Sequence, residues 1–167
     1  MLKNLLALLL LCLISFSCSN SLKTQSNSDI SGIKIGMSKE DTTKRLQEIG
    51  KIDREERKQQ EIWTLNNDPH YSHLIVAFDK EKQKVRFITA KARENGNRVR
   101  YGDVIDIGKA QLTSSANNYK YTQDVQASES NPAYIRIASG TDSNYLNYFS
   151  LKELNSSEEE SEEDEKD

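Results

Sequence analysis

Cysteine is nearly absent from this chain, and its scarcity excludes a fold held together by disulfides. Only Cys12 and Cys18 occur among the 167 residues. Cys12 lies inside an apolar N-terminal segment typical of a cleaved leader, so the mature chain keeps Cys18 alone. The remaining chain, roughly 150 residues, must therefore rely on its hydrophobic core, and it is long enough for one modest domain or two very small ones.

Residue patterns that carry familiar catalytic or metal chemistry are also missing. The only histidines are His70 and His73. With Asp68 they could be offered as metal ligands, but their spacing is not that of a helix-borne zinc pair, and solvated turn histidines are the simpler interpretation. No Gly-x-Ser-x-Gly segment and no phosphate-binding glycine loop is present, and Glu55 and Glu56 lie in a charged run typical of a solvated face. We therefore expect no catalytic residue, no metal and no cofactor.

The one long apolar run, residues 5–14, lies at the N-terminus and is too short for a membrane span, which needs about 20 residues in a helix. Lys3 precedes this run, and Ser17 precedes Cys18. The segment resembles the lipobox of bacterial lipoproteins, in which the cysteine carries a lipid on its sulfur. The resemblance predicts a signal peptide over residues 1–17 and lipid attachment at Cys18. The alternative is ordinary secretory cleavage that leaves Cys18 as a free thiol.

The segments on either side of the central region differ from it in composition. Residues 18–31 are rich in serine and asparagine and predict a flexible tether. In the last ten residues, 158–167, eight are Asp or Glu, so we expect a disordered acidic tail over residues 155–167. Such a tail either screens a basic surface of the domain or only keeps the protein soluble.

The central region begins with a helix whose start and end are both predicted by the sequence. Ser38 is a favourable N-cap, with Asp41 placed three residues later to reach back to it. Ile49 belongs to the apolar side of this helix, and we expect Gly50 to end it in the left-handed conformation. The charged run 51–61 that follows is compatible with either a second exposed helix or a loop.

Short apolar runs then predict three strands in each half of the central region, residues 32–95 and 96–154. In the first half they are Ile62–Leu65, Ser72–Asp79 and Lys84–Ala90, the last with Val85, Phe87 and Thr89 expected on one face. In the second half a helix over Tyr101–Gln111 precedes Tyr119–Thr122, Ala133–Ala138 and Tyr145–Leu151. The expected fold class is α+β, with short helices packed on one face of an antiparallel sheet. The sheet is either one extended sheet or two tandem helix-plus-three-strand repeats.

The order of these features resembles a known family. Residues 35–38, Gly50, Trp63 and the pair of strands around Asp79 are similar to the SmpA/OmlA group, which includes the small lipoprotein of the outer-membrane β-barrel assembly machine. The resemblance covers residues 33–92. It implies helices on one face of a small sheet and a role in protein–protein interaction at the envelope. The two halves together look like the tandem arrangement of β-lactamase-inhibitor proteins, which implies an inhibitor-like or ligand-binding module as the alternative.

Basic residues are concentrated between the second predicted strand and the second predicted helix. They form either a surface for anionic lipid, a polyanion or an acidic protein, or an exposed hairpin edge whose lysines prevent aggregation. We expect an envelope protein as the partner and the membrane as the anchor, without nucleic acid or a small-molecule substrate. The basic residues are Lys80, Lys82, Lys84, Arg86, Lys91, Arg93, Arg98 and Arg100.

Replacing the predicted lipid attachment site tests the predicted localisation, which is the outer membrane facing the periplasm or the cell surface. Cys18→Ala should move the protein from the membrane fraction to the soluble fraction, because the lipid supplies most of the attachment. Metabolic labelling with a fatty acid, followed by fractionation, measures both effects. If wild type takes up no label and the variant fractionates with wild type, the chain is not a lipoprotein.

Overall fold

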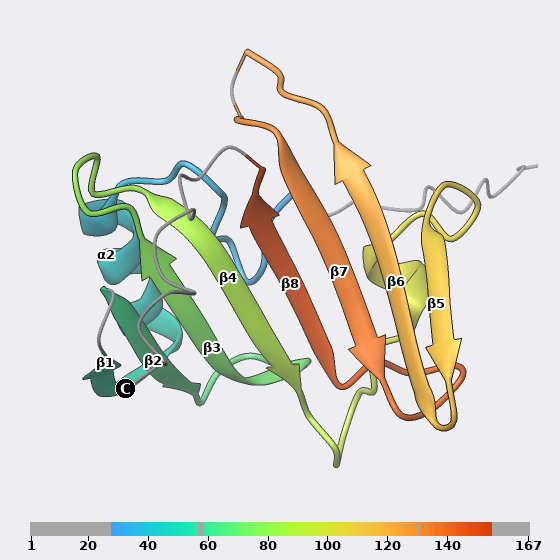
Figure 1. The fold of residues 1–167 in the computed structure, drawn as a ribbon. Helices are drawn as coiled ribbons and strands as arrows, with labels where there is room; N and C mark the ends of the chain where they lie inside the picture. The colour runs from blue at the N-terminus through green and yellow to red at the C-terminus, as the bar shows by residue number, and fades with distance from the viewer. Residues whose placement is uncertain (1–27, 57–58, 130, 155–167) are drawn as a thin grey trace, which may run out of the picture.

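Eight strands form one antiparallel sheet in the computed structural model, which describes residues 28–56, 59–129 and 131–154 (Figure 1). The strand order is β1-β2-β3-β4-β8-β7-β6-β5, so the last strands of the two halves, β4 and β8, pair at the centre. The strands are β1 (Gly50–Glu56), β2 (Gln60–Leu65), β3 (Tyr71–Phe78), β4 (Val85–Ala92), β5 (Gln111–Ser115), β6 (Asn118–Val125), β7 (Tyr134–Gly140) and β8 (Tyr148–Glu153).

The predicted α+β fold, with short helices packed on one face of a sheet, is wrong. The described residues contain two helices, α2 (Lys39–Ile49) and α3 (Tyr101–Val104), of 11 and 4 residues, against eight strands. The predicted helix over Tyr101–Gln111 stops at Val104, and the charged run after Gly50 forms a strand. The predicted repeat of a helix and three strands is also wrong, because each half contains four strands. The chain is predominantly β.

None of the described helices has the length and hydropathy that a membrane crossing requires. The predicted signal peptide, the acidic tail, the lipid attachment site Cys18 and most of the predicted tether lie outside the described residues. The described chain begins within the last residues of that tether. There the backbones of Ile30 and Ile33 exchange two hydrogen bonds of 2.9 Å, and both side chains are buried.

The start of α2 is confirmed, but the reason for its end is not the predicted one. The backbone N–H of Asp41 donates to Ser38 Oγ at 3.1 Å, as the N-cap pattern predicts. Gly50 has φ −164°, which is extended backbone and not the left-handed conformation. A Cβ at Gly50 would lie 2.3 Å from the carbonyl oxygen of Thr64. Glycine therefore lets β1 start close against β2.

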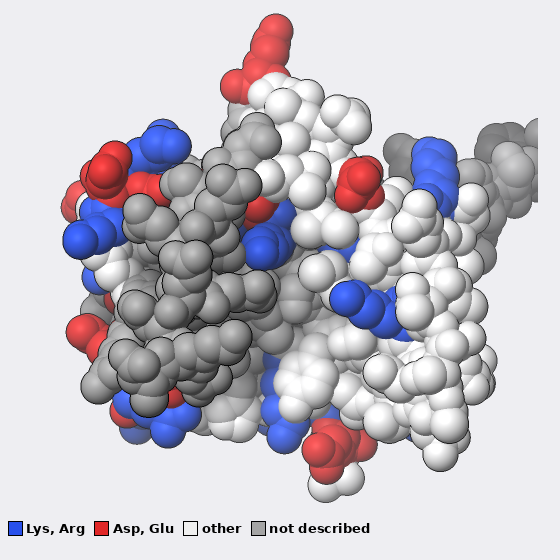
Figure 2. Space-filling model, in the orientation of Figure 1, with Lys and Arg blue, Asp and Glu red and all other residues white. Residues whose placement is uncertain are grey.

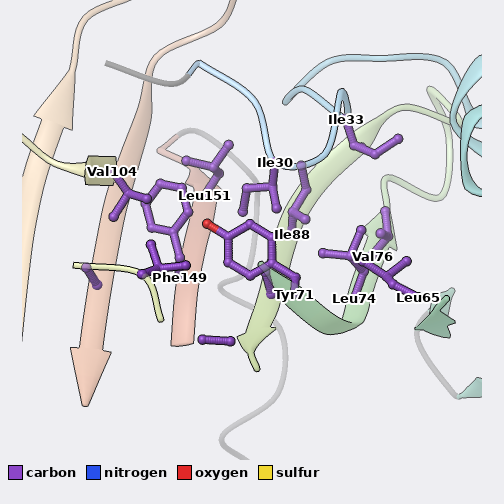
Figure 3. Packing of buried hydrophobic residues seen from close by; sticks show 14 of the residues in the cluster. Ile30, Ile33, Leu65, Tyr71, Leu74, Val76, Ile88, Val104, Phe149 and Leu151 are labelled. Atoms are coloured by element: carbon purple, nitrogen blue, oxygen red, sulfur yellow. The ribbon is translucent and has the colours of Figure 1, made fainter. Parts of the chain in front are cut away.

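The hydrophobic core lies on the side of the sheet that carries the helices. Figure 3 shows Ile30 close to Ile88 and Leu151, which come from the two central strands. The core row that crosses most of the sheet consists of the register partners Trp63, Leu74, Ala90, Phe149, Ala138 and Tyr121. Because neighbouring side chains alternate between the two faces, this row fixes which residues of every strand face away from the core.

One β-bulge changes a predicted face. Ala77 pairs with Phe87, but the next residue, Phe78, pairs with Val85, so Arg86 is the extra residue on β4. The bulge turns Val85 into the core, where it is fully buried, while Phe87 stays on the opposite face. The predicted single face for Val85, Phe87 and Thr89 is therefore wrong.

Trp63 is a core residue, with 3% of its surface exposed. We expect Trp63→Ala to lower the free energy of unfolding by about 3–5 kcal/mol, as other large aromatic deletions in cores do. Urea unfolding measures this loss. Its register partner Ile52 is 45% exposed, so Ile52→Ala is the control and should have a much smaller effect. A wild-type emission spectrum of fully solvated indole would contradict the burial of Trp63.

Candidate protein interface

The face of the sheet opposite the core carries none of the described helices. Both helices lie on the other side of the sheet in Figure 1, and their buried residues, such as Leu46 and Tyr101, belong to the core cluster. We call the opposite side the open face. Between β2 and β6, its residues form three rows of register partners. These are Ile62, Ile75, Thr89, Ser150, Ile137 and Thr122; Ala77, Phe87, Lys152, Ile135 and Asp124; and Thr64, His73, Lys91, Tyr148, Ser139 and Lys120.

Apolar side chains and hydroxyl groups dominate the open face. Ile75, Ile137 and Phe87 are half-buried, and Tyr148 is 45% exposed. At the centre of the face, the hydroxyl groups of Thr89 on β4 and Ser150 on β8 form a hydrogen bond of 2.8 Å. Figure 2 shows that this face is made mainly of uncharged side chains over β6 and β7. Such a surface offers contact area at little desolvation cost.

Charged side chains in these three rows are few and mostly positive. Lys91, Lys152 and Lys120 come from β4, β8 and β6, and the carboxylate in these rows is Asp124 on β6. Lys91 also lies 3.7 Å from Glu94, an exposed pair that holds it weakly. The three rows therefore combine a central pair of hydroxyl groups, apolar side chains on either side of it, and scattered positive charge.

The eight basic residues that are close in sequence do not form one surface. Lys80, Lys82 and Lys84 lie at the turn between β3 and β4, and all three are exposed. Asp79 organises this turn, because its carboxylate accepts hydrogen bonds from the backbone N–H groups of Lys82 and Glu81. The hydrogen bond from Lys82 is the main reason that the pKa of Asp79 lies below its usual range.

The remaining basic residues have partners within the fold. Arg93 donates to the carbonyl oxygens of Asp68 at 2.9 Å and Leu65 at 2.6 Å, which ties the end of β4 to the loop after β2. Arg98 pairs with Asp142 at 3.0 Å, and its guanidinium lies 4.0 Å from the ring centroid of Tyr145. Arg100 lies 5.8 Å from the same ring, and Arg86 Nε donates to the Phe78 carbonyl at 3.2 Å.

The residues that were considered as metal ligands have structural roles. Asp68 accepts the backbone N–H groups of His70 and Tyr71, each at 2.8 Å, and so shapes the turn before β3. His70 is exposed in the turn. His73 lies in β3, and its Nδ1 is 3.0 Å from the hydroxyl oxygen of the preceding residue, Ser72. In the part of the chain that the structure describes, no three His, Cys, Asp or Glu side chains are grouped so that they could hold a metal ion.

Among the described residues, two charged side chains are buried in the core, and one of the two has a charged partner there. Glu61 accepts a hydrogen bond from Trp63 Nε1 at 3.0 Å and pairs with Lys39 at 3.4 Å. Arg136 on β7 is 4% exposed and donates to the hydroxyl of Tyr134 at 3.2 Å and to the side chain of Gln123 at 3.5 Å. Arg136 Nε has no hydrogen-bond partner. No carboxylate of the described residues pairs with the Arg136 guanidinium.

Sequence reasoning missed the open face as a candidate site. The signal was present in the central strands, where Leu74–Phe78 is apolar without interruption and Ile135 and Ile137 alternate with core residues. A strand that is apolar on both faces is typical of a sheet that is covered on both sides. Here one side lacks a covering helix or strand among the described residues.

Comparison with protein-family models, with curated proteins and with solved structures found no match to this chain. The described part is therefore classed from its own geometry. It is a single-sheet β domain with a core on one side and an open face on the other.

The isolated charge of Arg136 leads to a stability prediction. Arg136→Met keeps the length of the side chain and removes a buried charge without an acidic partner. Such replacements are often neutral or stabilising by about 1–4 kcal/mol. Chemical unfolding measures the change, and Arg98→Met, at an exposed ion pair, is the control. A loss of stability on Arg136→Met would mean that the guanidinium is compensated in the folded protein.

Proposed function

We propose that this chain is a non-enzymatic bacterial envelope lipoprotein, anchored through Cys18, whose sheet binds another protein with its open face. The observation that carries the proposal is the row in which half-buried Ile62 and Ile75 in one half and Ile137 in the other flank the central pair Thr89 and Ser150. Soluble domains rarely leave a contiguous apolar surface without a function. The leader residues 1–17 support the location at the envelope.

The shape of the open face favours a macromolecule over a small ligand. Five strand-to-strand steps separate β2 from β6, which corresponds to a width of about 24 Å at the usual spacing. Sites for small molecules are concave and enclose most of the ligand. A broad sheet surface instead matches a standard protein interface, which covers roughly 800 Å² on each partner.

The chemistry of the open face specifies the kind of partner. Lys91 and Lys120 stand among the apolar and hydroxyl rows, opposed within these rows by Asp124. A partner with an apolar centre and an acidic rim would complement this pattern, and its acidic rim would speed association. The resemblance to the SmpA/OmlA group supports a role in assembly or maintenance of the outer membrane.

The second candidate is an inhibitor-like or ligand-binding module in the periplasm or at the cell surface. The continuity of the open face across both halves favours it, because a single rigid surface could cover the active site of a soluble enzyme. Pull-down from detergent-solubilised envelopes separates the two candidates. Recovery of membrane-assembly subunits supports the first, and recovery of one soluble enzyme supports the second.

A pair of variants with matched exposure tests the use of the open face. Tyr148 lies on the open face, and Ile52 lies on the opposite side of edge strand β1; each is 45% exposed. If Tyr148 is a central contact, Tyr148→Ala should weaken partner binding by at least about 2 kcal/mol, roughly thirtyfold in the dissociation constant. Ile52→Ala should leave binding unchanged.

Quantitative binding of the recovered partner, with circular dichroism to confirm folding, gives both results. Equal loss of binding in the two variants, or loss only in Ile52→Ala, would contradict an interface on the open face.

A further inference from the structure

The two edge strands of the sheet differ sharply in charge. β1 carries Lys51, Asp53, Arg54, Glu55 and Glu56, and its pairing with β2 is interrupted by a register shift between Ile52 and Arg54. Charge and irregularity are the usual devices that keep an exposed edge from pairing with another strand. β1 is therefore a protected edge.

The other edge, β5, has neither device. Its sequence, Gln-Leu-Thr-Ser-Ser, contains no charged residue and no proline, its pairing with β6 is regular, and all five residues are exposed. In an antiparallel ladder every second residue turns its backbone N–H and C=O away from the neighbouring strand. Because β5 is last in the strand order, these groups face outward along an uncharged edge.

Apolar side chains accompany this edge. Leu112 is 50% exposed and pairs with Tyr121, which packs against the core, so Leu112 lies on the core side of the sheet. Ile107, in the turn that leads from α3 to β5, is 48% exposed. The core side of the sheet thus ends at β5 in an exposed leucine.

We propose that β5 pairs antiparallel with β5 of a second copy of this chain, about a two-fold axis that places Leu112 opposite Leu112 of the second copy. A two-fold axis sets a strand against itself, so a neutral strand meets no like charge, whereas the carboxylates of β1 would face one another. Register partners must lie on the same face, and this register keeps both leucines on the core side. Pairing would satisfy the outward backbone groups next to Leu112 and bury both leucines.

The arrangement has a consequence for the open face. An axis perpendicular to the sheet keeps the open faces of both copies on the same side. The pair would present two equivalent surfaces to one side, so a partner with two copies of its own binding surface would gain from avidity. The proposed pairing stands on the properties of β5 and does not depend on which protein the open face binds.

The test uses the full-length lipoprotein in detergent and a short bis-maleimide crosslinker. In Leu112→Cys the new thiol lies at the two-fold axis, and we expect efficient crosslinking to a dimer. Ile52→Cys, at the other edge and with similar exposure, is the matched control and should give roughly tenfold less dimer, because β1 does not pair. Lipidation removes the reactive thiol of Cys18 from both proteins.

A second measurement guards against dimers formed by shared micelles. Sedimentation should show a dimer for wild type, and Leu112→Lys should weaken it roughly tenfold or more, as loss of a central apolar contact does. Leu112 is half exposed, so the variant should keep the wild-type circular dichroism spectrum. Equal crosslinking at both edges, or a monomeric wild type, would overturn the proposal. A monomer whose Leu112→Lys variant loses an envelope partner would instead assign β5 to an extended segment of that partner.

Discussion

The pairing of β4 with β8 is the contact on which the rest of the structure depends. Each of these strands is the last strand of its half of the chain. Five register pairs join them, from Phe87 and Lys152 to Lys91 and Tyr148. The pair Ile88 and Leu151 is fully buried on the core side, while Thr89 and Ser150 hydrogen-bond on the other. Without this seam each half would be a four-stranded sheet with an open central edge, and neither could complete its core.

The pairing of β4 with β8 also determines which side chains each face of the sheet presents. Side chains that alternate along β4 and β8 place Ala90 and Phe149 in the core and their neighbours on the open face. The helices and the segment around Ile30 cover only the core side. Apart from Ala77, which is buried, the apolar residues on the other side are half-buried or exposed, and neither of the described helices covers them. That division is why we assign binding to the open face and not to the helices.

Local signals in the sequence predicted some elements well and could not predict others. Ser38 and Asp41 define the start of α2 by a contact within four residues, and the apolar runs around Trp63 and Leu74 mark strands that are buried. β1 and β5 carry no such signal, because edge strands are specified by pairing with a neighbour and their side chains are exposed. Because the sequence analysis did not predict these two strands, it predicted an α+β fold in place of an eight-stranded sheet.

The candidate site could be predicted only in part from the sequence, for a related reason. Lys84 and Arg93 are nine positions apart in the sequence, but β4 extends between them for about 23 Å, so the basic residues do not gather. The open face, in contrast, collects single residues from many strands, and only the register brings Ile62, Ile75 and Ile137 into one row.

The most direct measurement is site-specific photocrosslinking in intact envelopes. A photoreactive residue placed at Ser139 on the open face should form an adduct with one discrete envelope protein, and the same residue at Glu48, exposed on α2, should not. An adduct from Glu48 with none from Ser139 would contradict the account.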